Sequence, residues 1–207
     1  MADKIKQLIH PLVPTTSTTA YTVPEGKYTV VKSIVINNIN SSDLTFTLRI
    51  GGAIIANNRK LKGNDTLVLN DLDVPLLPFE GIIVQSSNIS CVMYISGYER
   101  NYSAVDYPYA KVNAITSSSE SRLTWDDSDM MIKSIIIHNS NGSGDTGSIV
   151  LVSVGAPWYF IANKAIKSKD TVIIPNINLF LGRGTGLTYK SDVLSAYITV
   201  ILEKVVQ

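Results

Sequence analysis

The second half of this 207-residue sequence repeats the first half, and that repeat limits the folds open to the chain. Five segments recur in the same order at offsets of 101 to 106 residues. The matching pairs are 31–38 with 132–139, 56–57 with 162–163, 61–68 with 166–173, 81–82 with 186–187, and Glu99 with Glu203. The small drift in offset falls in turns, where loops accept insertions. We therefore predict a tandem duplication of one domain, because two copies are too few for a solenoid.

Both copies carry the pattern of short β-strands. Apolar and polar residues alternate over 44–50, which is typical of a half-buried strand. Clusters of Asn, Gly, Ser and Asp separate such runs, as in sandwiches and barrels. The sequence predicts an all-β chain with two tandem antiparallel β-sandwich domains, either jelly-roll or immunoglobulin-like. The predicted boundaries are an N-terminal extended arm over 1–20, domain 1 over 21–100, a linker over 101–120 and domain 2 over 121–207.

The charge balance argues against two classes of partner. The chain has 18 Lys and Arg residues against 17 Asp and Glu residues, so it lacks the basic excess that nucleic acids and anionic membranes attract. Charged residues make up 17% of the chain, against about 25% in a typical domain. Neither a secretory signal nor an apolar run of about 18 residues is evident. We expect no nucleic-acid partner, no membrane partner, and a surface partly buried against other proteins.

Catalytic residue types are scarce. Cys91 is the single cysteine, so no intramolecular disulfide can form, and its place in an alternating run predicts a small core residue. The two histidines, His10 and His138, leave little scope for histidine-based catalysis or metal binding. No Ser, His and Asp set follows from the spacing. We therefore predict that the chain is not an enzyme and carries no cofactor.

Two polar segments contain residue types that could bind a metal ion or a phosphate. Asp126, Asp127 and Asp129 could supply oxygens to calcium, but the distal Glu of a calcium loop is missing and a hairpin turn is favoured. The glycines of 182–186 could cradle phosphate, but a predicted strand follows them instead of a helix. A tight turn is favoured there too, because glycine permits positive φ. We predict no metal site.

Aromatic residues are the best candidates for an interaction site. Trp158 and Tyr159 lie together, Trp125 precedes them, and the predicted linker adds Tyr107 and Tyr109. They could stack on a sugar or contact another subunit. Where Trp158 and Tyr159 fall, the first copy has two isoleucines at 54–55, which favours a strand that packs on a core or an interface.

The first copy also resembles a known group of proteins. Five of its segments carry the resemblance: residues 21–38, which open with Thr22-Val23-Pro24-Glu25-Gly26-Lys27, the alternating residues 44–50, residues 62–67, residues 77–84, and residues 94–99. They are similar to the TVPxGK-type opening, the turn into a strand and the closing segment of small β-sandwich virion proteins of tailed bacteriophages, which include tail, neck and decoration domains. The second copy departs from this pattern, since 126–129 replaces the Pro-x-Gly-Lys turn.

The resemblance implies a structural component of a tailed-bacteriophage virion, in the neck, tail or collar region, assembled in the host cytoplasm. Its implied partners are copies of itself, in a homo-oligomeric ring, and other virion proteins. Low charge agrees with a subunit that buries surface in a symmetric assembly. The alternative is a receptor- or carbohydrate-binding module at a phage tail tip or capsid surface. Burial of the candidate aromatics in subunit contacts would favour assembly, whereas an exposed concave patch would favour glycan binding.

Overall fold

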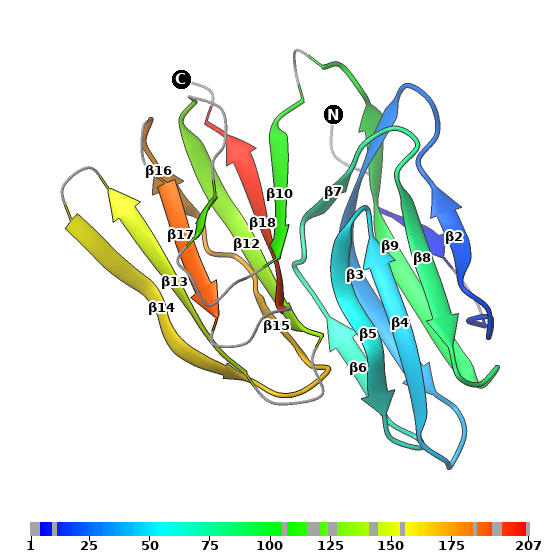
Figure 1. The fold of residues 1–207 in the computed structure, drawn as a ribbon. Helices are drawn as coiled ribbons and strands as arrows, with labels where there is room; N and C mark the ends of the chain where they lie inside the picture. The colour runs from blue at the N-terminus through cyan, green and yellow to red at the C-terminus, as the bar shows by residue number, and fades with distance from the viewer. Residues whose placement is uncertain are drawn as a thin grey trace. The chain divides into compact units, whose positions relative to one another are not determined.

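The computed structural model describes residues 5–9, 12–104, 107–115, 121–123, 128–140, 145–153, 156–183, 186–191 and 196–205. These residues form eighteen β-strands. Within that part of the chain, no helix is long and apolar enough to cross a membrane. The chain divides into unit 1, Met1–Tyr107, and unit 2, Pro108–Gln207 (Figure 1).

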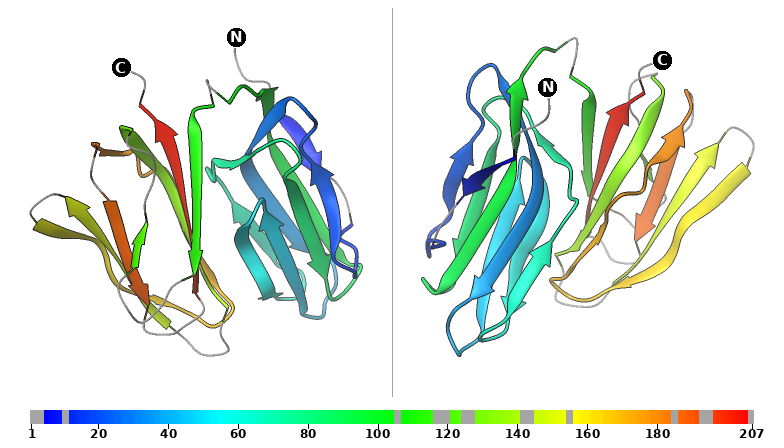
Figure 2. Two further views of the ribbon diagram at one scale, coloured as in Figure 1. Left: turned by 45° about the horizontal axis from the view of Figure 1, so that its top comes forward. Right: turned by 180° about the vertical axis from the view of Figure 1, so that it is seen from behind.

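Unit 1 contains nine strands in two antiparallel sheets. They are β1 (Lys6–Ile9), β2 (Thr18–Thr22), β3 (Lys27–Asn38), β4 (Leu44–Ile50), β5 (Ala53–Leu61), β6 (Thr66–Leu69), β7 (Val74–Leu76), β8 (Gly81–Ser86) and β9 (Cys91–Asn101). Sheet A has the order β1-β9-β3-β6, and β7 pairs with β3 beside β6. Sheet B has the order β2-β8-β4-β5. The two sheets face each other (Figure 2).

This strand order decides between the two predicted topologies. The chain crosses between the sheets after β1, β2, β3, β5, β7 and β8, and the last strand of each sheet lies next to its first. Because β6 and β7 pair with successive parts of β3, they act as one interrupted strand. The result is the eight-strand, two-sheet arrangement of a jelly roll. The immunoglobulin-like alternative is wrong for unit 1.

The core of unit 1 lies between sheets A and B. In β4, Leu44, Phe46, Leu48 and Ile50 are buried, and the residues between them are exposed or half-buried, which confirms the alternation predicted over 44–50. Each such side chain contributes about 1.5–3 kcal/mol when it leaves water. The other fully buried large side chains include Ile34, Ile36, Leu72, Leu76, Ile82, Met93 and Ile95. Cys91 is fully buried, as predicted.

Unit 2 has the same strand order as unit 1. Its strands are β10 (Tyr109–Ile115), β11 (Ser121–Leu123), β12 (Met130–Asn139), β13 (Asp145–Ser153), β14 (Ala156–Ile166), β15 (Thr171–Ile174), β16 (Leu179–Leu181), β17 (Gly186–Ser191) and β18 (Ala196–Lys204). Sheet C runs β10-β18-β12-β15 with β16 on β12, and sheet D runs β11-β17-β13-β14. Each position matches a strand of sheet A or sheet B, so unit 2 is a second jelly roll.

The equivalence of the units extends to single hydrogen bonds. Asn38 and Asn139 are both fully buried at the ends of equivalent strands. Their side-chain amides donate to the carbonyls of Leu61 and Ile166, at 3.3 Å in each case. Their backbone N–H groups donate to the backbone carbonyls of Asp65 and Asp170, at 3.0 Å in each case. A buried asparagine therefore holds the same turn in both jelly rolls.

Irregular backbone recurs at matching positions as well. The pairing of β3 with β9 shifts register after Val31, and the pairing of β12 with β18 shifts after Ile132. Residues with positive φ also match at the offset of 105: Asn64 with Lys169, Asp71 with Asn176, and Asp73 with Asn178. Such φ values are uncommon for residues other than glycine, so three coincident pairs describe one shared backbone path.

Two predicted boundaries do not agree with the structure. The predicted arm over 1–20 contains β1, which pairs with β9, and most of β2, which pairs with β8; Ile9 and Val13 are buried. The predicted linker over 101–120 contains β10, which pairs with β18 over its whole length. The division between units falls instead after Tyr107. These are short or polar strands at sheet edges, where apolar alternation is weak and strand signals are easily missed.

Candidate interaction surface

Four of the five predicted aromatic residues lie in the described part of the chain. Trp125 lies outside the described residues. Trp158 and Tyr159 lie in β14, where their backbone pairs with Leu151 and Val150 of β13, and their side chains are outside the described part. Tyr109 begins β10 in sheet C, opposite Glu203, and is half-buried. Tyr107 belongs to unit 1. The four described residues thus belong to different sheets and units.

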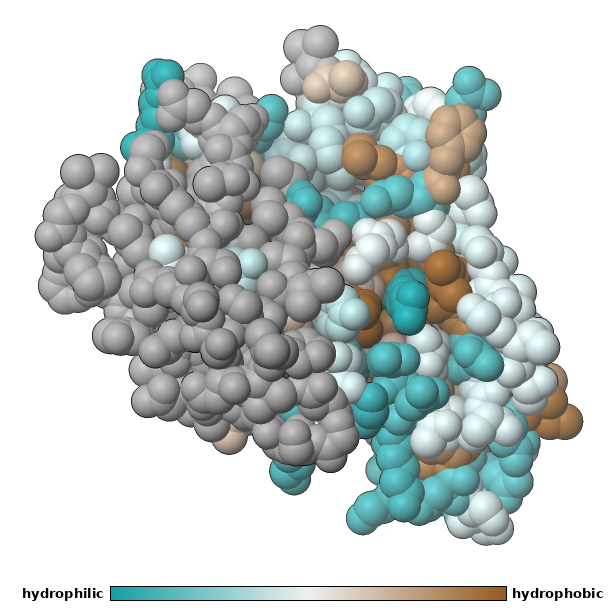
Figure 3. Space-filling view, in the orientation of Figure 1, coloured by the Kyte–Doolittle hydropathy of each residue, from teal (hydrophilic) through white to brown (hydrophobic). Residues whose placement is uncertain are grey.

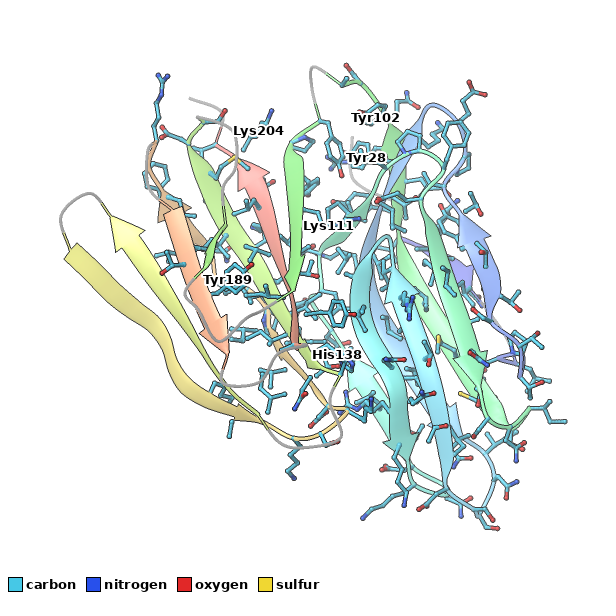
Figure 4. The ribbon with its side chains drawn as sticks, viewed as in Figure 1. Tyr28, Tyr102, Lys111, His138, Tyr189 and Lys204 are labelled. Atoms are coloured by element: carbon cyan, nitrogen blue, oxygen red, sulfur yellow. The ribbon has the colours of Figure 1, made fainter. Side chains whose placement is uncertain are left out.

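Tyr107 joins a group of tyrosines that the sequence did not bring together. Its ring centroid lies 5.2 Å from that of Tyr28, at an interplanar angle of 79°, and 5.5 Å from that of Tyr102. Aromatic pairs at such distances are each worth about 0.5–1.5 kcal/mol beyond burial. Figure 4 shows Tyr28 and Tyr102 at the same end of unit 1. We call Tyr28, Tyr98, Tyr102 and Tyr107 the tyrosine cluster.

Arg100 ties the tyrosine cluster together. Its guanidinium carbon lies 5.1 Å from the centroid of the Tyr98 ring, within cation–π range, and its Nη1 donates to the Tyr28 hydroxyl at 3.3 Å. Tyr28 and Tyr98 are buried, whereas Tyr107 is half-buried. Burial raises the pKa of the Tyr107 phenol, and the negative charge of Glu80 raises it further. Tyr107 is therefore uncharged at neutral pH, and Arg100 places a positive charge beside the tyrosine cluster at this end of the jelly roll.

The turn between β7 and β8 projects at this same end. Glu80 N–H donates to the Leu77 carbonyl at 3.0 Å, which closes a four-residue turn with Pro78 and Phe79 at its centre. Phe79 has a φ of +68°, and the residue is 69% exposed. Leu77 is 36% exposed beside it. In Figure 3, hydrophobic residues show as separate brown areas on a mostly white and teal face of unit 1.

The first two strands are locked to the jelly roll by a polar network. Lys6 and Tyr21 each contact the Glu99 carboxylate at 2.5 Å. Because the Tyr21 hydrogen goes to Glu99, the Thr29 hydroxyl donates to the Tyr21 oxygen at 2.7 Å. Burial raises the pKa of Tyr21, and the bond to Glu99 adds to this. Burial also acts to raise the pKa of Glu99, but the bonds from Lys6 and Tyr21 outweigh it and hold that pKa below its ordinary value.

A small polar hollow lies on sheet B, on the face away from the core. Its volume is about 160 Å³, and its lining is Thr15, Thr45, Phe46, Thr47, Asn58, Gln85, Ser86 and Ser87. A register shift between β4 and β5 places Asn58 at a φ of +53°, where its N–H donates to the Thr47 hydroxyl at 3.1 Å. Gln85 donates to the Thr15 carbonyl at 3.0 Å. The lining has no charged side chain, so the hollow suits a neutral polar group.

The structure describes only some of the residues that the sequence suggested for metal binding, phosphate binding or catalysis. Among the described residues, no three His, Cys, Asp or Glu side chains gather as a metal site would require. Asp126 and Asp127 lie outside those residues, while Asp129 accepts a bond of 2.8 Å from the Arg183 N–H. The segment 186–191 is a strand, β17, as predicted, whereas 184–185 is outside the described part. His138 is fully buried and contacts the Thr171 hydroxyl through Nδ1 at 3.0 Å.

The strand orders define this chain as an all-β protein with two jelly rolls in tandem. No protein-family model and no curated protein matches its sequence. Solved structures do match its fold. The major capsid protein P2 from Bacteriophage PM2 is 12% identical with a TM-score of 0.45, and the match covers 100% of this chain and 98% of that one.

Two further solved structures extend the comparison. The STIV MCP is 11% identical with a TM-score of 0.35, over 99% of this chain and 97% of that one. The SPP1 Dit (gp 19.1) protein is 7% identical with a TM-score of 0.32, over 78% of this chain and 99% of that one. Likeness at these levels concerns the fold alone, and one fold serves many functions.

Proposed function

We propose that this chain is a non-enzymatic structural subunit of a bacteriophage virion that assembles with copies of itself and with other virion proteins. The observation that carries the proposal is the pair of jelly rolls with one strand order in a single chain. Double-sheet jelly rolls are a common architecture of viral capsid domains. Two similar units give each chain two similar surfaces, which suits closed symmetric layers of repeated contacts. The solved viral structures named above are too distant to add weight to this.

The duplication itself is part of the proposal. The sequence repeat, the shared strand order, the buried Asn38 and Asn139, and the matching positive-φ residues all support descent of both units from one domain. Membership of the TVPxGK-type group rests on the first copy. There, Lys27 N–H donates to the Pro24 carbonyl at 3.2 Å and Gly26 has a φ of +67°, which is the tight turn that this motif implies.

Within a virion we place the subunit in the neck, tail or collar region, as a homo-oligomeric ring put together in the host cytoplasm. Low charge supports burial of surface in such a ring, since charged residues are depleted at the centres of interfaces. The exposed large apolar side chains of unit 1 are candidates for the surface that such a ring would bury. They include Leu12, Ile39, Val68, Phe79, Ile89 and Tyr94.

The test is to find the protein in particles. Phage particles from cultures that carry the gene are purified on a density gradient, and their proteins are quantified by mass spectrometry. The proposal expects this chain at a fixed copy number per particle and gold-labelled antibodies at one position on the virion. Its consistent absence from intact particles would refute a structural role.

The alternative function is a receptor- or carbohydrate-binding module at a tail tip or capsid surface. The polar hollow on sheet B favours it, because uncharged hydroxyl and amide groups are what a neutral sugar requires. A pocket of about 160 Å³ is nevertheless small beside ordinary ligand sites of roughly 300–1,000 Å³. A glycan array on the purified chain tests this function. Binding that Asn58→Ala and Gln85→Ala abolish would support it, and an array without binding would refute it.

A further inference from the structure

The Phe79 backbone has a conformation that its side chain does not favour. Its φ of +68° lies in the left-handed region, which is rare for bulky L-residues and ordinary for glycine. Unfavourable backbone of this kind persists where the surroundings enforce it, and it gathers at functional positions. The ring gains little from its own unit in return, since 69% of the residue is exposed.

The turn that carries Phe79 is held on both sides. Phe79 N–H donates to the Val23 carbonyl at 3.1 Å, and Val23 N–H donates to the Glu80 carbonyl at 2.9 Å. The Glu80 carboxylate accepts a further bond of 2.8 Å from the Leu77 N–H. Val23 itself is buried. An aromatic ring fixed in place in this way loses little freedom when a partner covers it, and rigid aromatic anchors dominate many interfaces.

The repeat indicates that the jelly roll itself does not call for phenylalanine here. At the offset of 105 that aligns Gly81 with Gly186, Phe79 aligns with Gly184. Glycine is the residue that such a turn position ordinarily takes. The aromatic ring is therefore an addition specific to unit 1, and it needs a reason outside the fold.

A matching acceptor lies elsewhere on unit 1. On sheet A, Val35 pairs with Tyr94 on one side and with Val68 on the other, so the three form one row across β9, β3 and β6. Because residues that alternate with them along these strands are buried, the row lies on the outer face. Tyr94 is 44% and Val68 is 51% exposed. We call these three residues the sheet A row.

The rows on either side of the sheet A row are uncharged and mostly polar. Ser33 pairs with Ser96, and their hydroxyls are 2.6 Å apart. Asn37 pairs with Val92 and with Thr66. An uncharged apolar centre with a mostly polar, uncharged surround is matched in character to an uncharged aromatic ring.

We propose that Phe79 anchors self-assembly by docking on the sheet A row of a second copy of this chain. This deepens the proposed function and rests on it. The projecting turn and the sheet A row consist of different residues, so a head-to-tail, heterologous contact is open to them. Each copy then gives an anchor to one neighbour and takes one from another, which generates a ring where the rotation closes.

Three variants of the full chain test this by light scattering over a concentration series. Phe79→Gly removes the anchor and suits the backbone, and Val68→Asp places a charge in the acceptor. Each is expected to weaken self-association at least about 30-fold, the loss typical of an anchor residue. The matched control is Phe180→Ala, since Phe180 is also an exposed phenylalanine, at 53%, but lies on unit 2. Its self-association should equal that of the unaltered chain.

Mixing the two defective variants distinguishes this contact from general damage. Phe79→Gly keeps the acceptor and Val68→Asp keeps the anchor, so the mixture should form one-to-one heterodimers that grow no further. Thermal unfolding of both variants, followed by circular dichroism, verifies that they fold. Undiminished assembly by folded Phe79→Gly, or the lack of a heterodimer in the mixture, would refute the role of Phe79 as an anchor. Neither result would refute the proposed function. An unaltered chain that stays monomeric overturns both the anchor and self-assembly.

Discussion

Replacing Asn38 by alanine should destabilise unit 1 strongly. Its side-chain nitrogen donates to the Ser42 carbonyl at 2.8 Å and the Lys62 carbonyl at 3.0 Å, and its oxygen accepts from the Asn40 N–H at 3.1 Å. A net value of about 1 kcal/mol for each of these three bonds predicts a loss of about 3 kcal/mol. That is a large part of the roughly 5–15 kcal/mol that stabilises a typical domain.

The assay can address the two units separately. Both tryptophans, Trp125 and Trp158, belong to unit 2, so their fluorescence reports unfolding of that unit alone, while circular dichroism reports both. In urea, Asn38→Ala should move part of the circular dichroism transition to lower denaturant and leave the fluorescence transition in place. The control is Asn40→Ala in the same turn, whose side chain makes an exposed bond to the Ser42 N–H at 3.2 Å. It should cost less than about 1 kcal/mol.

Two results would refute this reasoning. A loss below about 0.5 kcal/mol for Asn38→Ala would mean that water or relaxed backbone replaces the buried bonds. An equal shift of the tryptophan transition would mean that Asn38 does not act within unit 1 alone.

Three further predictions concern the same unit. Folding holds the pKa of Glu99 below its ordinary 4.5, so the Glu99 carboxylate stabilises unit 1 fully above pH 4.5. That stabilisation is lost as the pH falls through the lower pKa of the folded state. Thermal unfolding measured over a range of acid pH should show this loss, and Glu99→Gln should remove it. Phe79→Gly should raise stability to urea by about 1 kcal/mol, since glycine accepts positive φ, and a lower stability would contradict the assigned strain. Tyr107→Ala should cost about 1–3 kcal/mol through loss of its two ring pairs, measured by calorimetry, whereas a neutral effect would show that the tyrosine cluster does not hold its end of unit 1.

The sequence predicts those parts of the fold that depend on neighbouring residues. Alternation over 44–50 places β4 with its correct faces, and the small size and setting of Cys91 place it in the core. The Pro24–Lys27 turn follows from Gly26 at its third position, where φ is positive. The strand order does not follow, because β1 pairs with β9 and β2 pairs with β8 across most of the unit. Such non-local pairing leaves no local signal.

The missed features had signals of a different kind. The edge strands β1 and β10 look like an arm and a linker because each offers one short or polar run next to a proline. The sequence repeat carries a signal for both strands, because an edge strand at the start of unit 1 implies an equivalent edge strand at the start of unit 2. Comparison of the copies also marks Phe79, where the second copy has Gly184. The tyrosine cluster could not be foreseen, because the β3 and β9 registers bring Tyr28 and Arg100 together.

Light scattering of the purified full chain, with negative-stain images of the same fractions, tests the central claim of self-assembly most directly. The account predicts a mass several times the 22.6 kDa of one chain and closed rings of uniform size. A mass of 22.6 kDa at every concentration up to the solubility limit, with no rings in the images, would contradict it.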